Sequence, residues 1–278
     1  MILNEAHLIY FSPTQTSKKI AEAFARGTGI KQVIITDLTT HSVDAIALPA
    51  SSLAIIVVPV YGGHVAPLAM KRLQNIQGTN TPAVLVVVYG NRAYDKALKD
   101  LDLFASSHGF KVVAGATFIG EHSFSTDKHS IAAGRPDSDD LAFAGKWAET
   151  VMEKLRTVDS PNKLRAINVS SIRKPNQPLF PLLRFIRRAL KLQRSRVAVP
   201  RTPWVPQESK CTHCGLCVQR CPTGAIAKGD ELHTDAEKCI RCCACVKVCA
   251  QGARVYETPF AAVLADCFKK QKAPQAIV

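Results

Sequence analysis

Eight of the ten cysteines in this 278-residue chain follow one spacing that occurs twice. Each copy reads C-x2-C-x2-C-x3-C, a pattern whose thiolates bind iron–sulfur cubanes, because three of them can wrap a tight loop around one cluster while the fourth points away. Paired C-x2-C units also build four-thiolate zinc sites, which are the alternative. The third and fourth cysteines and the doubling favour clusters. The eight residues are Cys211, Cys214, Cys217, Cys221, Cys239, Cys242, Cys245 and Cys249.

The crowding of cysteines also bears on the compartment. Nine of them lie within residues 211–249, and the first residues, MILNEAHLIYFSPT, lack the basic and apolar regions of an export signal. In a reducing compartment such crowding indicates metal rather than disulfides. We therefore expect a cytoplasmic protein. Cys243 and Cys267 lie outside the pattern, and we expect reduced bystander thiols there rather than redox groups.

The cysteine pattern resembles that of bacterial two-cluster ferredoxins, with Pro222 directly after the first copy. The resemblance implies two [4Fe-4S] clusters that exchange their fourth ligands. The stretch between the copies resembles the hairpin that joins the halves of such ferredoxins, and Ala250 departs from the proline common there. The implied ligand sets are Cys211, Cys214, Cys217 and Cys249 for one cluster, and Cys239, Cys242, Cys245 and Cys221 for the other.

Three loops in the first half of the chain could hold a phosphate and a flat ring. The stretch FSPTQTSKKIAEAFA runs from a hydroxyl-rich turn into a helix, whose N-terminus offers free N–H groups to an anion. Helix capping alone is the simpler explanation for these hydroxyls. Two further strands end in VPVYGGH and VYGNRAYDK, where tyrosines can stack on a ring and glycines let backbone amides approach it.

Together, SPTQTS (12–17), PVYGG (59–63) and YGNRAY (89–94) resemble the FMN-binding loops of flavodoxins. Gln15 departs from the glycine common in the phosphate loop. His64, Glu121 and His122 lie near the same loops, and we expect them on the solvated surface rather than in a proton-transfer role. The residues that the resemblance implies for FMN are Ser12, Thr14, Gln15, Thr16, Ser17, Pro59, Val60, Tyr61, Gly62, Gly63, Tyr89, Gly90, Asn91 and Tyr94.

Short apolar runs alternate with amphipathic stretches over residues 1–156, which predicts a parallel sheet covered by helices on both faces. Strands are expected near 7–11, 32–36, 53–59, 83–89 and 111–119, and four helices between and after them. The fold class is therefore α/β, with a doubly wound five-stranded sheet, and the resemblance of the three loops implies that this sheet is flavodoxin-like. We expect this domain at 1–156, a basic, proline-rich linker at 157–203, and a small α+β ferredoxin-like domain with a C-terminal tail at 204–278.

The net charge of +14 is concentrated in the linker, where residues 160–207 hold eleven Lys or Arg and no Asp or Glu. Residues 178–196 have the spacing of an amphipathic basic helix. Such a helix can pack its apolar side between the domains, dock an acidic redox partner, or lie on a membrane surface. Nucleic-acid binding is a further use of such charge, and we do not expect it here.

The whole organisation resembles the flavodoxin–ferredoxin fusion proteins of anaerobic prokaryotes. FMN exchanges one or two electrons whereas a cluster passes one, so the resemblance implies a relay of low-potential electrons between FMN, the clusters and a partner redox protein. The alternative is a reductase whose FMN, fed by the clusters, reduces a small molecule. No G-x-G-x-x-G motif for a nicotinamide cofactor occurs.

Anaerobically purified protein is expected to contain one FMN and about eight iron atoms per chain, because eight cysteines complete two cubanes. Iron, labile sulfide, zinc and flavin are measured on the same sample. Stoichiometric zinc without labile sulfide would contradict the prediction.

Overall fold

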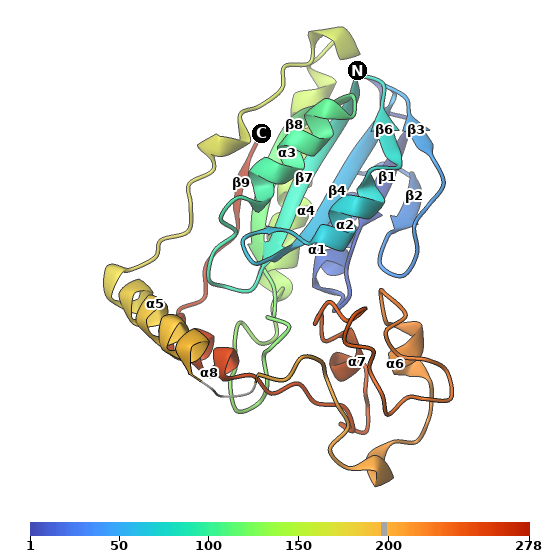
Figure 1. Cartoon of the computed structure of the whole chain (residues 1–278). Coiled ribbons are helices and arrows are strands. Elements are labelled where there is room, and N and C mark those ends of the chain that lie inside the picture. The colour runs from blue at the N-terminus through green and yellow to red at the C-terminus, as the bar shows by residue number, and fades with distance from the viewer. Residues whose placement is uncertain (196–198) are drawn as a thin grey trace.

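The first half of the chain forms a parallel β-sheet with helices on both faces (Figure 1). The computed structural model describes residues 1–195 and 199–278. The five parallel strands lie in the order β2-β1-β4-β7-β8, the doubly wound order 2-1-3-4-5 of flavodoxin-like folds. All five expected strands are confirmed. They are β1 (Glu5–Tyr10), β2 (Gln32–Asp37), β4 (Ser52–Tyr61), β7 (Thr81–Tyr89) and β8 (Phe110–Ile119).

Two helices cover each face of this sheet. Helices α1 (Thr16–Gly27) and α4 (Ser138–Arg156) pack on one face, and α2 (Pro67–Leu73) and α3 (Ala97–Ser107) on the other. Strands β4 and β7 are buried on both faces, which is why their sequences are continuous apolar runs. Helices α1 and α4 approach closely at Gly27, where a Cβ atom would lie 2.3 Å from the Gly145 carbonyl oxygen.

Three short strands accompany the main sheet. Strand β3 (Ile46–Leu48) pairs with β6 (Ile76–Gly78), and β5 (His64–Val65) pairs with the end of β4. Strand β9 (Gln275–Ile277) lies antiparallel to β8, so the C-terminus extends the sheet of the N-terminal half. The sequence did not predict this sixth strand of the main sheet.

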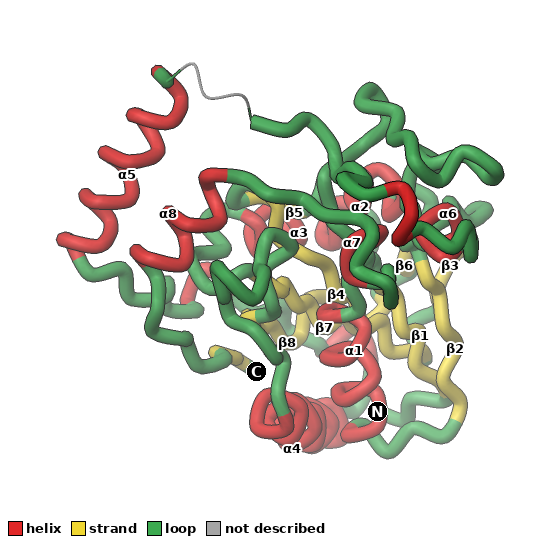
Figure 2. The backbone as a smooth tube through the Cα atoms, turned by 90° about the horizontal axis from the view of Figure 1, so that it is seen from below, coloured by secondary structure: helices red, strands yellow, loops and turns green. Residues whose placement is uncertain are grey.

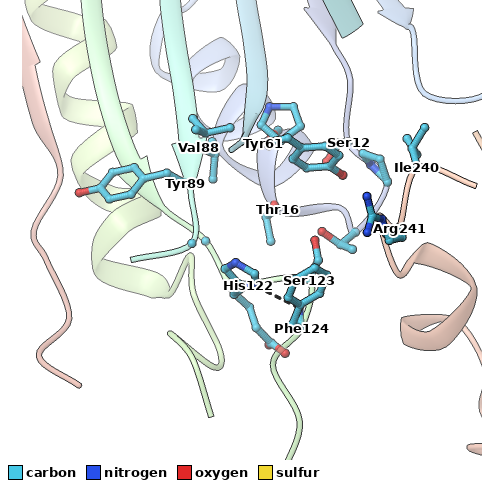
Figure 3. A pocket seen from close by; sticks show the side chains of 18 of the residues that line it. Ser12, Thr16, Tyr61, Val88, Tyr89, His122, Ser123, Phe124, Ile240 and Arg241 are labelled. Atoms are coloured by element: carbon cyan, nitrogen blue, oxygen red, sulfur yellow. Dashed lines mark hydrogen bonds between the residues drawn. The ribbon is translucent and has the colours of Figure 1, made fainter. Parts of the chain in front are cut away.

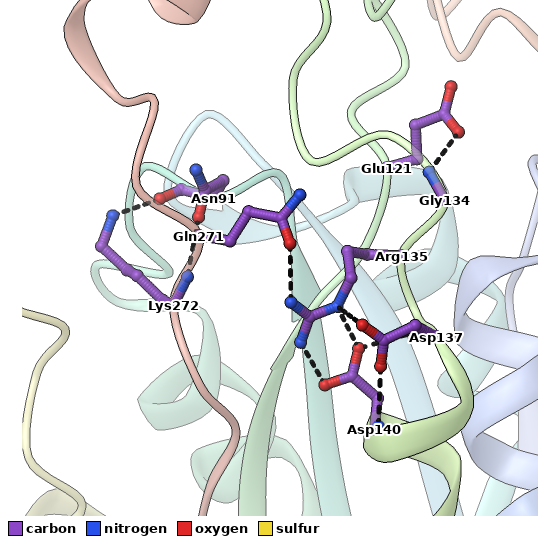
Figure 4. A network of polar contacts seen from close by, with 8 residues as sticks. All are labelled: Asn91, Glu121, Gly134, Arg135, Asp137, Asp140, Gln271 and Lys272. Atoms are coloured by element: carbon purple, nitrogen blue, oxygen red, sulfur yellow. Dashed lines mark hydrogen bonds and ion pairs between the residues drawn. The ribbon is translucent and has the colours of Figure 1, made fainter.

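The segment before β9 is fixed to the first half by polar contacts (Figure 4). The fully buried Asn91 side chain donates hydrogen bonds to the carbonyl oxygens of Phe268 (2.7 Å) and Lys270 (3.2 Å). The Arg135 guanidinium donates to the Gln271 side chain at 2.8 Å and pairs with Asp140. The C-terminal tail is therefore held against the first half of the chain.

The cysteine-bearing half lies beyond the carboxyl ends of the strands (Figure 1). Its elements are the short helices α6 (Leu216–Gln219) and α7 (Ala244–Lys247) and the 3-10 turn η3 (Glu208–Lys210). The two cysteine copies share their backbone shape as well as their spacing, since positions 28 residues apart adopt matching left-handed conformations. These pairs are His213 and Arg241 (φ 51° and 55°), Gly215 and Cys243 (72° and 59°), and Gly224 and Gly252 (63° and 57°).

The linker contains the expected amphipathic helix, α5 (Leu179–Arg194). It lies at the rim of the molecule beside α8 (Pro259–Cys267), apart from the sheet (Figure 2). The 3-10 turns η1 (Pro161–Lys163) and η2 (Val169–Ser171) precede it and follow the surface of the first half. Among the described helices, none is both long and apolar enough to cross a membrane.

Replacing Asn91 by Ala is expected to lower the free energy of unfolding by about 2–3 kcal/mol, because it leaves buried carbonyl groups of the C-terminal segment without donors. Chemical denaturation followed by circular dichroism measures the change. The matched control, Asn75→Ala, removes an exposed hydrogen bond to Val43 and is expected to cost under about 1 kcal/mol. Equal effects would show that Asn91 does not hold the tail.

Candidate functional site

A pocket of about 380 Å³ opens at the carboxyl edge of the sheet, where all three expected loops meet (Figure 3). Parallel strands bring their C-terminal loops to one edge, so loops distant in sequence line one site. Ten of the fourteen residues expected for FMN line this pocket. They are Ser12, Thr14, Thr16, Ser17, Pro59, Val60, Tyr61, Gly62, Tyr89 and Gly90.

The N-terminus of α1 forms one end of the pocket. Gln15 caps it in a left-handed conformation (φ 66°), without a side-chain bond to the helix, so it reproduces the backbone shape that glycine would adopt. The Ser12 hydroxyl accepts a hydrogen bond from the Lys18 amide at 3.0 Å. The buried Ser17 hydroxyl has no hydrogen-bond partner among the residues that the structure describes. An unsatisfied donor beside a helix N-terminus fits a bound phosphate.

Tyr61 and Tyr89 contribute from the ends of β4 and β7. Burial raises the pKa of both phenols well above the ordinary value, so both stay neutral at physiological pH. A Cβ atom at position 90 would lie 2.2 Å from Cδ2 of His122, so the His122 ring leaves room only for glycine. Tyr61 therefore offers a neutral aromatic side chain to a flat ring, whereas the Tyr89 ring points away from the pocket toward Tyr94 (Figure 3).

Four of the expected residues lie elsewhere. The Gln15 amide bonds back to the Ser12 carbonyl oxygen, and Gly63 (φ 88°) makes room for Asp95. Asn91 holds the C-terminal segment, as described above. The Tyr94 hydroxyl donates to the Ile172 carbonyl oxygen at 3.3 Å, and its ring meets that of Tyr89 edge-on. Tyr94 and Asn91 therefore stabilise the loop after β7 on the side that faces away from the pocket.

The loop after β8 lines the pocket with residues 120–124, so the partly exposed Glu121 and His122 face the pocket as well as solvent. The Nδ1 atom of His122 accepts a hydrogen bond from the Phe124 amide at 3.0 Å, which leaves the proton of the neutral ring on Nε2. Burial, with the Lys247 ammonium nearby, lowers the pKa of His122 to about 4. His64 is on the surface as expected, 2.7 Å from Asp100.

Two residues of the cysteine-bearing half, Ile240 and Arg241, also line the pocket. Figure 3 shows them entering from that half. Arg241 lies between the expected cluster ligands Cys239 and Cys242. Its counterpart in the first copy, His213, instead pairs with Glu231 at 2.9 Å and lowers the pKa of that carboxyl to about 2. The repeat therefore diverges where its second copy meets the pocket.

Five cysteines line a separate cavity directly behind this contact. Four of them, Cys221, Cys239, Cys242 and Cys245, are the set that the resemblance implies for one cluster, and the fifth is Cys243. The Ala225 amide donates to the Cys221 sulfur at 3.2 Å, which orients that thiol. Burial raises the pKa of the Cys242 and Cys245 thiols to about 12.

The other expected set is nearer the surface. Cys214 is exposed, and Cys211, Cys217 and Cys249 are partly exposed. Among the described residues, no group of three or more His, Cys, Asp or Glu side chains is close enough to hold a single metal ion. Outside the pattern, Cys243 is buried in the left-handed position that Gly215 occupies in the first copy, and Cys267 packs within α8.

The two halves are joined by specific polar contacts around the pocket. The guanidinium of Arg72, a buried residue of α2, donates to the Pro222 carbonyl oxygen at 2.7 Å and to the Leu38 carbonyl oxygen at 2.7 Å. Lys247 of α7 pairs with Glu121 and donates to the Ser125 carbonyl oxygen at 2.9 Å. The cysteine cavity is thereby held against the pocket.

Comparison with known proteins identifies the part of the chain that holds the first cysteine copy. Residues 204–227 match the 4Fe-4S binding domain family, Fer4. Combined with the flavodoxin-like strand order, this match shows how the chain is organised. It joins a flavodoxin-like α/β fold to a 4Fe-4S binding domain. Fold and 4Fe-4S domain together support a redox role in electron transfer. No curated protein matches the chain.

Among solved structures, the chain is similar to a Streptococcus pneumoniae flavodoxin (20% identity over 54% of this chain and 99% of that one, TM-score 0.38). It is similar to an archaeal flavodoxin (13% identity over 55% of this chain and 99% of that one, TM-score 0.35). It is also similar to a Bacillus anthracis azoreductase (11% identity over 53% of this chain and 100% of that one, TM-score 0.39). These scores are low, so the fold assignment rests on the strand order of this chain.

The neutral His122 predicts a pH dependence of stability. Its folded pKa lies below the unfolded value, so its contribution is complete above about pH 6.5 and is lost as pH falls toward 4. When the pH falls from 7 to 5, the free energy of unfolding should decrease less in His122→Gln than in the wild type. The difference between the two decreases is expected to be at most about 2 kcal/mol. His233→Gln, at an exposed histidine, is the control and should follow the wild type.

Proposed function

We propose that this protein transfers electrons between an FMN in the pocket, two [4Fe-4S] clusters and a partner redox protein. The observation that carries the proposal is the loop 240–241, which lies between expected cluster ligands and also lines the pocket. A cofactor in the pocket and a cluster in the cysteine cavity would then be separated by one short loop. Short separation is what electron transfer between two bound groups requires.

The pocket residues fit FMN by their chemistry. The hydroxyls of Ser12, Thr14 and Ser17 at the N-terminus of α1 would hold the phosphate. Tyr61 would lie against the ring, the backbone of Tyr89 and Gly90 would border it, and Arg241 would bring a positive charge to its surroundings. FMN supplies exchange between two-electron and one-electron chemistry, and the chain contributes binding, orientation and exclusion of water.

The two cysteine sets suggest an order for the route. The set with the exposed Cys214 faces solvent, whereas Cys242 and Cys245 are buried beside the pocket. We place the partner protein at the exposed set, the second set next, and FMN at the inner end. Lys210 and Arg220 flank the exposed set in the sequence and are themselves exposed, so complementary charge favours an acidic partner. A reducing compartment such as the cytoplasm suits these clusters.

A reductase of a small molecule is the second candidate, and His122 is the observation that favours it. A reductase needs a proton donor near the ring in addition to an electron route. His122 lines the pocket and keeps a proton on Nε2. Its pKa of about 4 makes it a donor of hydrogen bonds rather than a cationic acid at neutral pH.

Ser17→Ala tests the phosphate end of the pocket. The variant is expected to bind FMN about 10-fold or more weakly, because it loses a hydrogen bond to a charged group. The apoprotein should be at least as stable as the wild type, because the lost hydroxyl is buried without a partner. Quenching of flavin fluorescence on titration of apoprotein gives the affinity.

Riboflavin, which lacks the phosphate, should bind the Ser17→Ala and wild-type proteins equally. Ser107→Ala, at a hydroxyl on the far end of α3, is the matched control. Equal weakening of riboflavin and FMN would show that Ser17 does not contact the phosphate.

His122→Ala distinguishes relay from reductase. Electron flow from a reduced viologen through the clusters to cytochrome c is expected to stay within about threefold of the wild type, since outer-sphere transfer needs no acid–base group. His64→Ala, at the surface, is the control. A reaction with a small-molecule acceptor that is lost in His122→Ala alone, with cofactors and one-electron flow intact, would make the protein a reductase.

A further inference from the structure

Helix α5 has one side packed and another uncovered. Phe185 and Leu192 pack beside α8, where the rings of Phe185 and Phe268 are 5.3 Å apart and Arg188 pairs with Asp266 at 2.8 Å. At 3.6 residues per turn, four further apolar residues lie within an arc of about 60° around the helix axis, on a different side from Phe185 and Leu192. This outer stripe, Leu179, Leu183, Ile186 and Leu190, is exposed.

The exposure of the outer stripe is large. Leu179 is 64% exposed and Leu183 52%, and Phe180 in the first turn is 83% exposed. Leu183, Ile186 and Leu190 line one shallow surface depression together with Arg187, Lys191 and Arg194. Figure 2 shows that α5 lies at the periphery with only α8 alongside, so no other described element covers the stripe. Contiguous exposed apolar side chains of this kind mark an interaction surface.

The charge of the helix selects the partner. Helix α5 carries five Arg or Lys and no Asp or Glu. The basic side chains Arg187 and Arg194 border the outer stripe, so their charges and the apolar side chains reach the same surface. Lys269 and Lys270 of the C-terminal segment are exposed and line a cavity with Pro178 and Pro181 at the start of α5. The partner that complements this helix has negative charges at its surface and an apolar layer below them.

We propose that α5 binds the surface of a bilayer containing anionic lipids, with the outer stripe inserted among the acyl chains near the headgroups and the basic side chains at the phosphates. A second copy of this chain is disfavoured, because a two-fold contact would oppose like charges. An acidic protein or a nucleic acid would pair with the charges but leave the exposed Leu and Phe side chains in water. The inference does not depend on the proposed electron route.

The test is co-sedimentation of the holoprotein with vesicles of phosphatidylcholine, alone or mixed in equal parts with phosphatidylglycerol. Binding is expected to the mixed vesicles and to weaken at about 1 M salt, where charges are screened within about 3 Å. Arg187→Gln/Lys191→Gln should bind about 30-fold more weakly, at about fivefold per charge. Lys31→Gln/Lys99→Gln, which removes two exposed charges elsewhere, should bind like the wild type.

The apolar contribution is tested separately. Leu183→Ser/Leu190→Ser should bind mixed vesicles at least about fivefold more weakly, because less apolar surface is inserted. Leu103→Ser, at a comparably exposed leucine on α3, should not change binding. Unchanged cluster absorbance and melting temperature show that each variant is folded.

Three results would overturn the proposal. They are absence of binding to mixed vesicles, equal losses in the control variants, and retention on polyglutamate or duplex DNA that depends on Arg187 and Lys191 without any binding to vesicles. The last result would assign α5 to an acidic protein or a nucleic acid.

Discussion

Parallel strands leave all their carboxyl ends at one edge of a sheet, and in this protein that edge organises the rest of the structure. The loops after β1, β4, β7 and β8 meet there, and so does the N-terminus of α1. The cysteine-bearing half closes over the same edge and contributes Ile240 and Arg241. Hydrogen bonds from Arg72 and Lys247 hold the two halves together. Ile240 lines both the pocket and the cysteine cavity, so the two share a wall.

The internal repeat shows how a symmetric unit acquires two different roles. Both copies keep the same left-handed backbone positions, because the spacing of the thiols requires the same loop. Their side chains differ where the surroundings differ. His213 pairs with Glu231 near solvent, whereas Arg241 enters the pocket. Cys243 accepts a conformation that favours glycine, and its buried side chain lines the cysteine cavity.

Segments outside the expected first domain complete its structure. Val169 and Ile172 join the core on the α3 face, β9 adds an antiparallel edge strand, and Asn91 holds the chain that leads to β9. An edge strand that is paired in this way leaves β8 without free hydrogen-bonding groups along part of its length. Helix α5 connects the two halves at the rim, and its outer stripe is left for another partner.

The sequence by itself determined the features that depend on residue spacing and residue type within one segment. The apolar runs predicted all five parallel strands, the cysteine spacing predicted the 4Fe-4S domain that residues 204–227 confirm, and the linker predicted α5. Tertiary structure alone decided what distant segments do to each other. His122, Arg241 and β9 have no local signal, because their environments arise from residues more than a hundred positions away in several cases. Asn91 and Tyr94 follow a ring-binding motif in sequence, yet packing turns their side chains toward Phe268 and Ile172, since buried polar groups must find partners wherever the fold supplies them.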